Sequence, residues 1–259
     1  TNVVGGNWQK LRLTDLKGWQ QYYRALAEKT NLFPIAPQAQ SPAADVLLAL
    51  SRYDSIIEEL RQASRLPFSR FPLSYDNEDL STILFPHFEA LKGCAIVLDL
   101  RIHAELQSER SDKALEDIKL LLRLNDSLRT EPFLMSHLVR MAMAAIAIEP
   151  VWEGLAEHRW SDAQLAELDR ELGKLDFLTD YEREMRSEMA LRVAKVDYLR
   201  RHRRALANRT VGDDSSPPLP VRVLSHLIPS GWFYQNQLRF ARLIVHHFLP
   251  AVNLNRGVM

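Results

Sequence analysis

Hydrophobic residues recur with the spacing of an α-helix along most of the chain, most regularly over residues 88–206. Within this stretch Leu91, Leu98 and Ile102 fall on one side of a single helix. Runs of β-branched residues are few, and no Asn-Gly or Asp-Gly turn separates two alternating apolar runs. The pattern therefore predicts an all-α fold, either an irregular helical bundle or a short tetratricopeptide-like superhelical array of roughly 8–10 helices.

Capping residues and prolines predict where these helices begin and end. A first helix, capped by Thr14, is expected to end near Asn31, and prolines make residues 66–73 irregular. The other helices are expected over residues 43–64, 77–86, 88–106, 131–156, 181–206 and 231–249, with two more beginning near residues 111 and 161.

The last two helix starts resemble each other. Ser111-Asp112 and Ser161-Asp162 stand fifty residues apart, and apolar residues follow both at matching offsets. Ser161 and Gln164 have the spacing of a capping box, in which each side chain binds a backbone amide of the other. Two copies are fewer than the three that a solenoid requires, so the repeat favours paired helices without requiring a superhelix.

The segment from Met141 to Ile148 is apolar on every side and rich in small residues. We therefore expect it at the centre of the bundle, with Pro150 bending or ending its helix. Arg140 and Glu149 bound the run, which is shorter than the roughly 20 apolar residues of a spanning helix, so the sequence does not predict a transmembrane segment.

Prolines and polar residues also suggest the domain limits. Pro34, Pro37 and Pro42 indicate an extended connector, so residues 1–42 are expected to form a helix with an arm. Residues 43–259 are then expected to form a single all-α domain, in which residues 210–220 have the composition of a mobile loop.

Charge and cysteine content narrow the classes of function. The chain has 33 basic and 33 acidic residues, so no overall field attracts nucleic acid, and no nucleic-acid-binding module is recognisable. Cys94 is the only cysteine and is expected to be a buried structural thiol. The sequence holds no phosphate loop or nucleophile elbow, and no cofactor is predicted.

Histidines and carboxylates allow only sparse candidate sites. Asp99 and His103 stand four residues apart, but His-Glu-x-x-His is absent, so a hydrogen-bonded histidine is favoured and no metal site is predicted. Glu149, Arg140 and His137 form the candidate catalytic set, because a carboxylate at the end of an apolar run can act as a general acid or base. The alternative is a structural carboxylate with an arginine or backbone partner.

Two segments, one rich in arginine and one rich in aromatic residues, could bind a partner or a membrane. One is the arginine-rich end of the helix over residues 181–206, and the other is the start of the last helix. The alternatives are a solvated helix end that complements the helix dipole and an aromatic staple into the core. The candidate binding residues are Arg200, Arg201, Arg203, Arg204, Trp232 and Tyr234.

Several phrases of the chain resemble an uncharacterised family of bacterial proteins. They are Phe71-Pro72, Leu84-Phe85-Pro86-His87, Ser127-Leu128-Arg129 with Glu131-Pro132, Leu138-Val139-Arg140, Val151-Trp152-Glu153-Gly154-Leu155, Trp160-Ser161-Asp162, and Pro229-Ser230-Gly231-Trp232-Phe233-Tyr234-Gln235-Asn236-Gln237. The resemblance implies an N-terminal membrane segment followed by a helical domain, and it implies nothing about activity. We expect the periplasmic side of the inner membrane if an apolar leader precedes Thr1, and the cytoplasm otherwise.

These patterns favour a non-enzymatic interaction or scaffold module at the bacterial cell envelope, with an unknown protein partner bound in a groove between helices. One alternative is an enzyme with an acid/base site around Glu149, Arg140 and His137. Another is a peripheral membrane protein that uses the arginine-rich helix end and Trp232.

Overall fold

The computed structural model describes residues 5–211 and 218–252. Over these residues the regular secondary structure is helical, and an isolated bridge between Asn7 and Arg12 is the one β-type pairing found. The prediction of an all-α fold is confirmed. The loop expected to be mobile lies largely outside the described residues.

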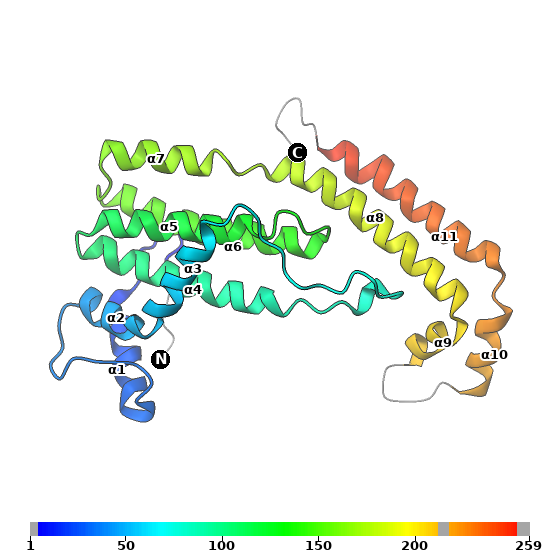
Figure 1. Ribbon diagram of the computed structural model, residues 1–259, viewed down its shortest axis with the longest axis horizontal. Helices are drawn as coiled ribbons and strands as arrows, with labels where there is room; N and C mark the ends of the chain where they lie inside the picture. The colour runs from blue at the N-terminus through cyan, green and yellow to red at the C-terminus, as the bar shows by residue number, and fades with distance from the viewer. Residues whose placement is uncertain (1–4, 212–217, 253–259) are drawn as a thin grey trace. The chain divides into compact units, whose positions relative to one another are not determined.

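The α-helices follow one another along the chain, and a long connection over residues 65–85 joins α3 to α4 (Figure 1). They are α1 (Leu16–Thr30), α2 (Pro42–Leu50), α3 (Asp54–Ser64), α4 (Pro86–Gln107), α5 (Ser111–Asp126), α6 (Leu134–Ala156), α7 (Asp162–Leu172), α8 (Phe177–Arg201), α9 (Arg203–Val211), α10 (Leu219–Leu227) and α11 (Ser230–Leu243). Short 3-10 turns cover Trp8–Lys10, Ser51–Tyr53, Leu80–Thr82 and Leu249–Ala251, and a π-helical turn covers Ile244–Phe248.

The contacts group the described chain into two compact units. The first takes in residues up to 70 together with 86–130 and 138–176, and the second takes in residues 71–85, 131–137 and those from 177 onward. Within the first unit, α1 packs on α2 and α2 packs on α4. The contacts therefore group the N-terminal helix with this unit, and the domain limit near residue 42 stays a prediction.

The first unit is built around the long pair α4 and α5, which lie side by side (Figure 1). Helices α1 and α2 cover one end of α4 through an apolar cluster. Its buried members are Leu16, Tyr23, Ala43, Val46, Ala49, Leu50, Leu100 and Ala104.

Local capping explains several helix ends. The capping box of Ser161 and Gln164 is present at the start of α7, as predicted. Asn31 ends α1 with φ of 48°, a left-handed conformation that asparagine tolerates better than most residues. The cap of α1 is Asp15, whose side chain accepts a hydrogen bond from the Gly18 amide, so the prediction of Thr14 as the cap is wrong.

Three expected helices are shorter or broken. Residues 43–64 are interrupted by a 3-10 turn, where the Ser51 hydroxyl donates a hydrogen bond to the Leu48 carbonyl at 2.7 Å. Residues 77–86 contain only the turn Leu80–Thr82, because Pro86 already begins α4, a position that proline favours. The helix expected over residues 181–206 begins earlier and is interrupted at His202.

Helix α6 differs from the expected central helix. Its buried residues recur with helical spacing on one side, whereas Leu138, Met141 and Ile148 on the other side are 49%, 47% and 37% exposed. Pro150 lies inside the helix and does not end it. By length and composition alone α6 could cross a membrane, although 44% of its most apolar window is buried in the protein.

In the second unit, α11 packs along α8. Phe233 is 1% exposed, and the Gln237 side chain donates a hydrogen bond to the Val193 carbonyl at 2.9 Å. The guanidinium of Arg192 lies 5.2 Å from the centre of the Phe240 ring, a cation–π contact between the same two helices.

Two helical glycines in the first unit make a matched test of packing. A Cβ at Gly154 would lie 2.1 Å from Nε1 of the buried Trp160, whereas a Cβ at Gly93 would meet nothing within 4 Å. Gly154→Ala is expected to lower the free energy of unfolding by about 1–3 kcal/mol through overpacking. Gly93→Ala is expected to raise it by about 0.5–1 kcal/mol through helix propensity. Urea denaturation would measure both, and a stabilising Gly154→Ala would contradict the close packing.

Candidate functional site

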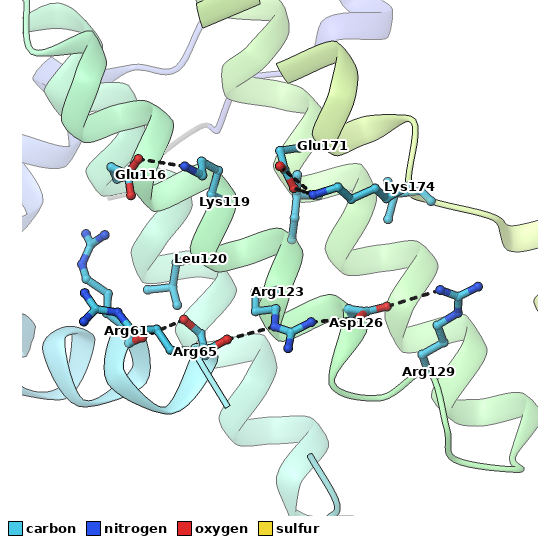
Figure 2. Close-up of a pocket in the computed structure, with 13 residues that line it drawn as sticks. Arg61, Arg65, Glu116, Lys119, Leu120, Arg123, Asp126, Arg129, Glu171 and Lys174 are labelled. Atoms are coloured by element: carbon cyan, nitrogen blue, oxygen red, sulfur yellow. Dashed lines mark hydrogen bonds and ion pairs between the residues drawn. The ribbon is translucent and has the colours of Figure 1, made fainter. Parts of the chain in front are cut away.

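A hollow of about 490 Å³ opens in the first unit between α3, α5 and the end of α7 (Figure 2). Each helix contributes one edge, and the residues after α5 and α7 extend the lining. We call this hollow the α3–α5–α7 groove. Its lining residues are Arg61, Ser64, Arg65, Glu116, Lys119, Leu120, Leu122, Arg123, Asp126, Arg129, Glu171, Lys174 and Leu175.

The groove is positively charged although the whole chain is neutral. Six of its lining residues are lysine or arginine and three are glutamate or aspartate, an excess of three positive charges. A local excess of this kind attracts anionic groups over about a Debye length, even when the net charge of the protein is zero.

Helix α5 supplies the central row of charges by its periodicity. Glu116, Lys119, Arg123 and Asp126 follow one another at intervals of three or four residues, which puts them on one side of the helix. Lys119 binds Glu116 at 3.0 Å, and Arg123 binds Asp126 at 3.4 Å. The hydrogen bond that Lys119 donates to Glu116 raises the pKa of Lys119, so this amine is charged at neutral pH.

A triad formed by Asp117, Arg61 and Arg101 lies beside the groove. The carboxylate of Asp117 is 1% exposed and binds Arg61 of α3 on one oxygen and Arg101 of α4 on the other, the latter at 2.9 Å. Burial raises the pKa of Asp117, and the two guanidinium groups oppose that effect. The triad fixes the position of α3 against α4 and α5, and with it the edge of the groove.

The Arg123 side chain caps the C-terminal end of α3. Its Nε donates to the Ser64 carbonyl at 3.0 Å and its Nη2 to the Leu66 carbonyl at 2.9 Å. A cation is favourable there because the last carbonyls of a helix carry partial negative charge. Arg123 therefore has a structural role as well as a place on the wall of the groove.

Arg65 is the cation best placed to meet a ligand. Its side chain is exposed at the edge of the groove, and the described part of the chain gives its guanidinium no hydrogen bond or ion pair. Lys174, on the opposite edge, is 62% exposed and binds Glu171 one turn before it. An exposed pair of this kind contributes only about 0.3–0.5 kcal/mol, so a stronger anionic ligand can replace it.

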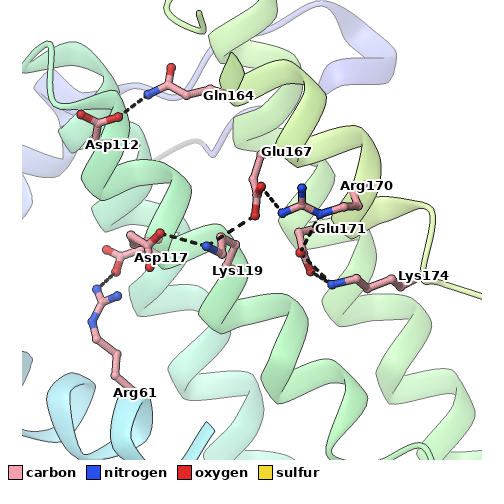
Figure 3. A network of polar contacts seen from close by, with 10 residues as sticks. Arg61, Asp112, Asp117, Lys119, Gln164, Glu167, Arg170, Glu171 and Lys174 are labelled. Atoms are coloured by element: carbon pink, nitrogen blue, oxygen red, sulfur yellow. Dashed lines mark hydrogen bonds and ion pairs between the residues drawn. The ribbon is translucent and has the colours of Figure 1, made fainter. Parts of the chain in front are cut away.

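A polar network on α5 and α7 holds the far wall (Figure 3). Gln164 of the capping box donates to Ser111 at 3.0 Å and to Asp112 at 2.7 Å, so the two similar helix starts meet. Farther along, Glu167 of α7 lies 3.5 Å from the amine of Lys119. These contacts set the distance between α5 and α7.

Comparisons of the chain with family models, with curated proteins and with solved structures found no match. The geometry of the site therefore carries the functional argument.

The three candidate catalytic residues have different surroundings. Glu149 accepts a hydrogen bond from the Trp8 amide at 3.0 Å. Arg140 is buried, and its carbonyl accepts a hydrogen bond from the Asn125 side chain. His137, in the second unit, has its ring 5.9 Å from that of Phe177. Arg140 and Glu149 stand nine residues apart on α6, roughly 13 Å along the axis, so they do not form a pair.

The candidate arginines lie in the second unit. Arg200 and Arg201 both bind Asp197, and hydrogen bonding from Arg200 lowers the pKa of that carboxyl. Arg203 lies over the Phe233 ring with its guanidinium carbon 4.3 Å from the ring centre. Arg204 is exposed.

The aromatic residues at the start of α11 divide between core and surface. Phe233 between them is buried, whereas Trp232 and Tyr234 are 49% and 53% exposed. The ring of Tyr234 lies 5.4 Å from the guanidinium carbon of Arg200. The staple into the core therefore consists of Phe233, and the two candidate rings remain at the surface.

The sequence indicated only part of one polar cluster, which includes Asp99, His103 and Glu153. His103 is 2% exposed, its Nδ1 lies 2.8 Å from the Asp99 carbonyl, and its Nε2 lies 3.2 Å from a carboxylate oxygen of Glu153. The same oxygen of Glu153 accepts hydrogen bonds from the Thr14 amide at 2.6 Å and the Thr14 hydroxyl at 2.7 Å. The spacing of Asp99 and His103 hinted at the cluster, but nothing marked Glu153 as their partner.

This cluster holds the N-terminal segment onto α6. Gly6 fits there because it has no side chain: a Cβ would lie 2.4 Å from Glu153 and 2.7 Å from Glu149. Among the described residues no group of three histidine, cysteine or acidic side chains has the arrangement of a metal site. The prediction of a hydrogen-bonded histidine is confirmed at His103.

Proposed function

We propose that this protein is a helical interaction module and that the α3–α5–α7 groove binds an acidic segment of a partner protein. The observation that carries the proposal is the groove lining, in which positive charges outnumber negative ones by six to three while Arg65 keeps an exposed guanidinium. The neutral net charge makes this attraction a property of the groove rather than of the whole surface.

The spacing of the cations favours an extended peptide. Lys119 and Arg123 stand four residues apart on α5, about 6 Å along the axis. Alternate residues of an extended chain are separated by about 6.6 Å, so glutamates at every second position match the two cations. The carboxylates of Glu116, Asp126 and Glu171 also line the groove, and they can accept hydrogen bonds from the amide or hydroxyl groups that lie between the glutamates of such a peptide.

A labelled peptide of four Glu-Ser repeats tests this proposal by fluorescence anisotropy. At about 50 mM salt we expect saturable binding that weakens as salt rises, because exposed ion pairs are screened. A Lys-Ser peptide of equal length is expected not to bind. Absence of binding by the acidic peptide, or equal binding by a single-stranded oligonucleotide, would contradict the proposal.

Charge reversal locates the binding. Arg65→Glu combined with Lys174→Glu places two carboxylates on opposite edges of the groove and is expected to weaken peptide binding at least tenfold. The matched control is Arg186→Glu, which reverses an arginine that is 59% exposed and paired with Glu182 on α8. The control is expected to bind as the wild type does, and equal loss in both variants would place the binding elsewhere.

The bacterial cell envelope, which the family resemblance implies, is part of the proposal as the location of the module. Fractionation of native bacterial cells, followed by detection with an antibody, tests it. Recovery of the protein only in the cytosolic fraction would remove this part and leave the groove proposal in place.

A further inference from the structure

A pocket of about 220 Å³ lies in the second unit. It is bounded by residues 80–85, by residues 133–135 at the start of α6, and by one side of α8. All of these residues belong to the second unit, so contacts within that unit alone form the pocket. We call it the α8 pocket.

The wall of the α8 pocket opposite to α8 is mainly apolar. Ile83 and Phe133 are buried, and the ring of Phe85 lies edge to face against that of Phe133 with the ring centres 4.9 Å apart. Sites for small molecules typically have such walls, in which apolar and aromatic side chains surround most of the ligand and a few polar groups orient it. This wall therefore favours an apolar ligand group.

Helix α8 supplies the charged groups of the pocket. Its lining residues follow one another at intervals of three or four, which puts them on one side of the helix; they are Glu188, Leu191, Arg192 and Lys195. Arg192 binds Glu188 at 3.2 Å, and a partly exposed pair of this kind contributes little to stability. The lining thus holds two cations and one carboxylate, and a ligand with one negative charge balances the difference.

The volume of the α8 pocket limits the size of its ligand. A cavity of about 150 Å³ holds one benzene ring, whereas drug-sized ligands occupy pockets of roughly 300–1,000 Å³. A pocket of about 220 Å³ therefore accommodates one ring together with a carboxylate, and it is too small for a nucleotide.

We infer that the α8 pocket binds a small monocarboxylate whose apolar part is about the size of one aromatic ring. The ring packs against Phe85 and Phe133, and the carboxylate lies on the side of α8, where Lys195 donates to it. A hydrogen bond between two charged groups is roughly twice as strong as one between neutral groups, so the acid binds better than a neutral molecule of the same shape. This site is separate from the α3–α5–α7 groove, and neither proposal depends on the other.

Titration of the full chain with phenylacetate, followed by NMR of isotope-labelled methionine methyl groups, tests the inference. Met135 lines the pocket, so its methyl signal is expected to shift saturably with a Kd of about 1 mM, an ordinary affinity for a ligand of about ten non-hydrogen atoms. Acetate, which lacks the ring, and 2-phenylethanol, which lacks the charge, are each expected to bind at least tenfold more weakly. Absence of saturation up to about 10 mM phenylacetate, or equal binding of 2-phenylethanol, would overturn the inference.

Lys195→Gln locates the carboxylate of the ligand. This variant is expected to bind phenylacetate at least tenfold more weakly and 2-phenylethanol as the wild type does, because only the charged group loses its partner. The matched control is Lys174→Gln in the α3–α5–α7 groove, which should bind phenylacetate as the wild type does. Equal helicity by circular dichroism separates binding from folding. Undiminished binding by Lys195→Gln, or equal loss in both variants, would contradict the site.

Discussion

Asp117→Ala is expected to lower the free energy of unfolding by about 3–5 kcal/mol, the largest effect of a single substitution that we predict. The carboxylate is 1% exposed and neutralises Arg61 and Arg101, which are themselves only 23% and 17% exposed. Its removal leaves two partly buried guanidinium groups without their common partner. Chemical denaturation at pH 7 measures the loss.

The neighbouring residue provides the control. Glu116 is 58% exposed and binds Lys119 on the same helix, so Glu116→Ala is expected to cost less than about 0.5 kcal/mol. If the two alanine variants lost equal stability, the triad would not hold α3 in place. Asp117→Asn, which keeps the size of the side chain but removes its charge, is expected to fall between them.

The free energy of unfolding is expected to fall as pH rises from about 4 to above 7, in part because Asp99 and His103 hold their protons more tightly in the folded protein than in the unfolded chain. Burial raises the pKa of Asp99 from 3.8 to about 6, although the nearby His103 opposes the rise. Burial itself disfavours charged His103, but hydrogen bonding to Glu153 and the charge of Asp99 raise its pKa overall. Both groups therefore bind more protons in the folded state than in the unfolded state, and such a difference makes stability decrease with pH.

The contributions of the two groups occupy successive pH ranges. Below about pH 4 Asp99 is largely neutral in both the folded and the unfolded state, so it does not lower the free energy of unfolding. As pH rises, ionisation of Asp99 lowers the free energy of unfolding by an amount that reaches about 2–3 kcal/mol by pH 7.5. Charged His103 stabilises the fold below about pH 6.5, and this contribution disappears as pH rises through its higher folded pKa.

Asp99→Asn tests the lower part of the range. Its stability relative to the wild type is expected to increase by about 2–3 kcal/mol between pH 4 and pH 7.5, measured by urea denaturation at several pH values. The control is Asp76→Asn, at an exposed aspartate, which should follow the wild-type curve. A pH profile of Asp99→Asn parallel to that of the wild type would contradict the raised pKa of this carboxyl.

The elements that sequence reasoning predicted best are those with local causes. The start of α7 follows from Ser161 and Gln164, three residues apart, and the end of α1 follows from Asn31. The break at Ser51–Tyr53 was missed because a serine inside a helical pattern gives no sign that it will bind a carbonyl three residues earlier.

The candidate site was less predictable because its parts come from distant segments. Arg61 and Asp117 stand 56 residues apart, and the periodicity of each helix shows which side is buried without showing which helix covers it. The sequence drew attention to Arg200 and Arg201 as a run of like charge, yet Asp197 on the same helix binds both. The groove cations are scattered among carboxylates in the sequence and gather only in the fold.

By itself the sequence determined that this protein is helical and where many of its helices start and stop, because helix periodicity and caps act over a few residues. Only the tertiary structure decided that α3, α5 and α7 enclose a cationic groove and that Glu153 binds Thr14 and His103. It also decided that α6 is covered on one side. The physical reason is that packing choices between amphipathic helices depend on the fit of whole surfaces, which no local pattern encodes.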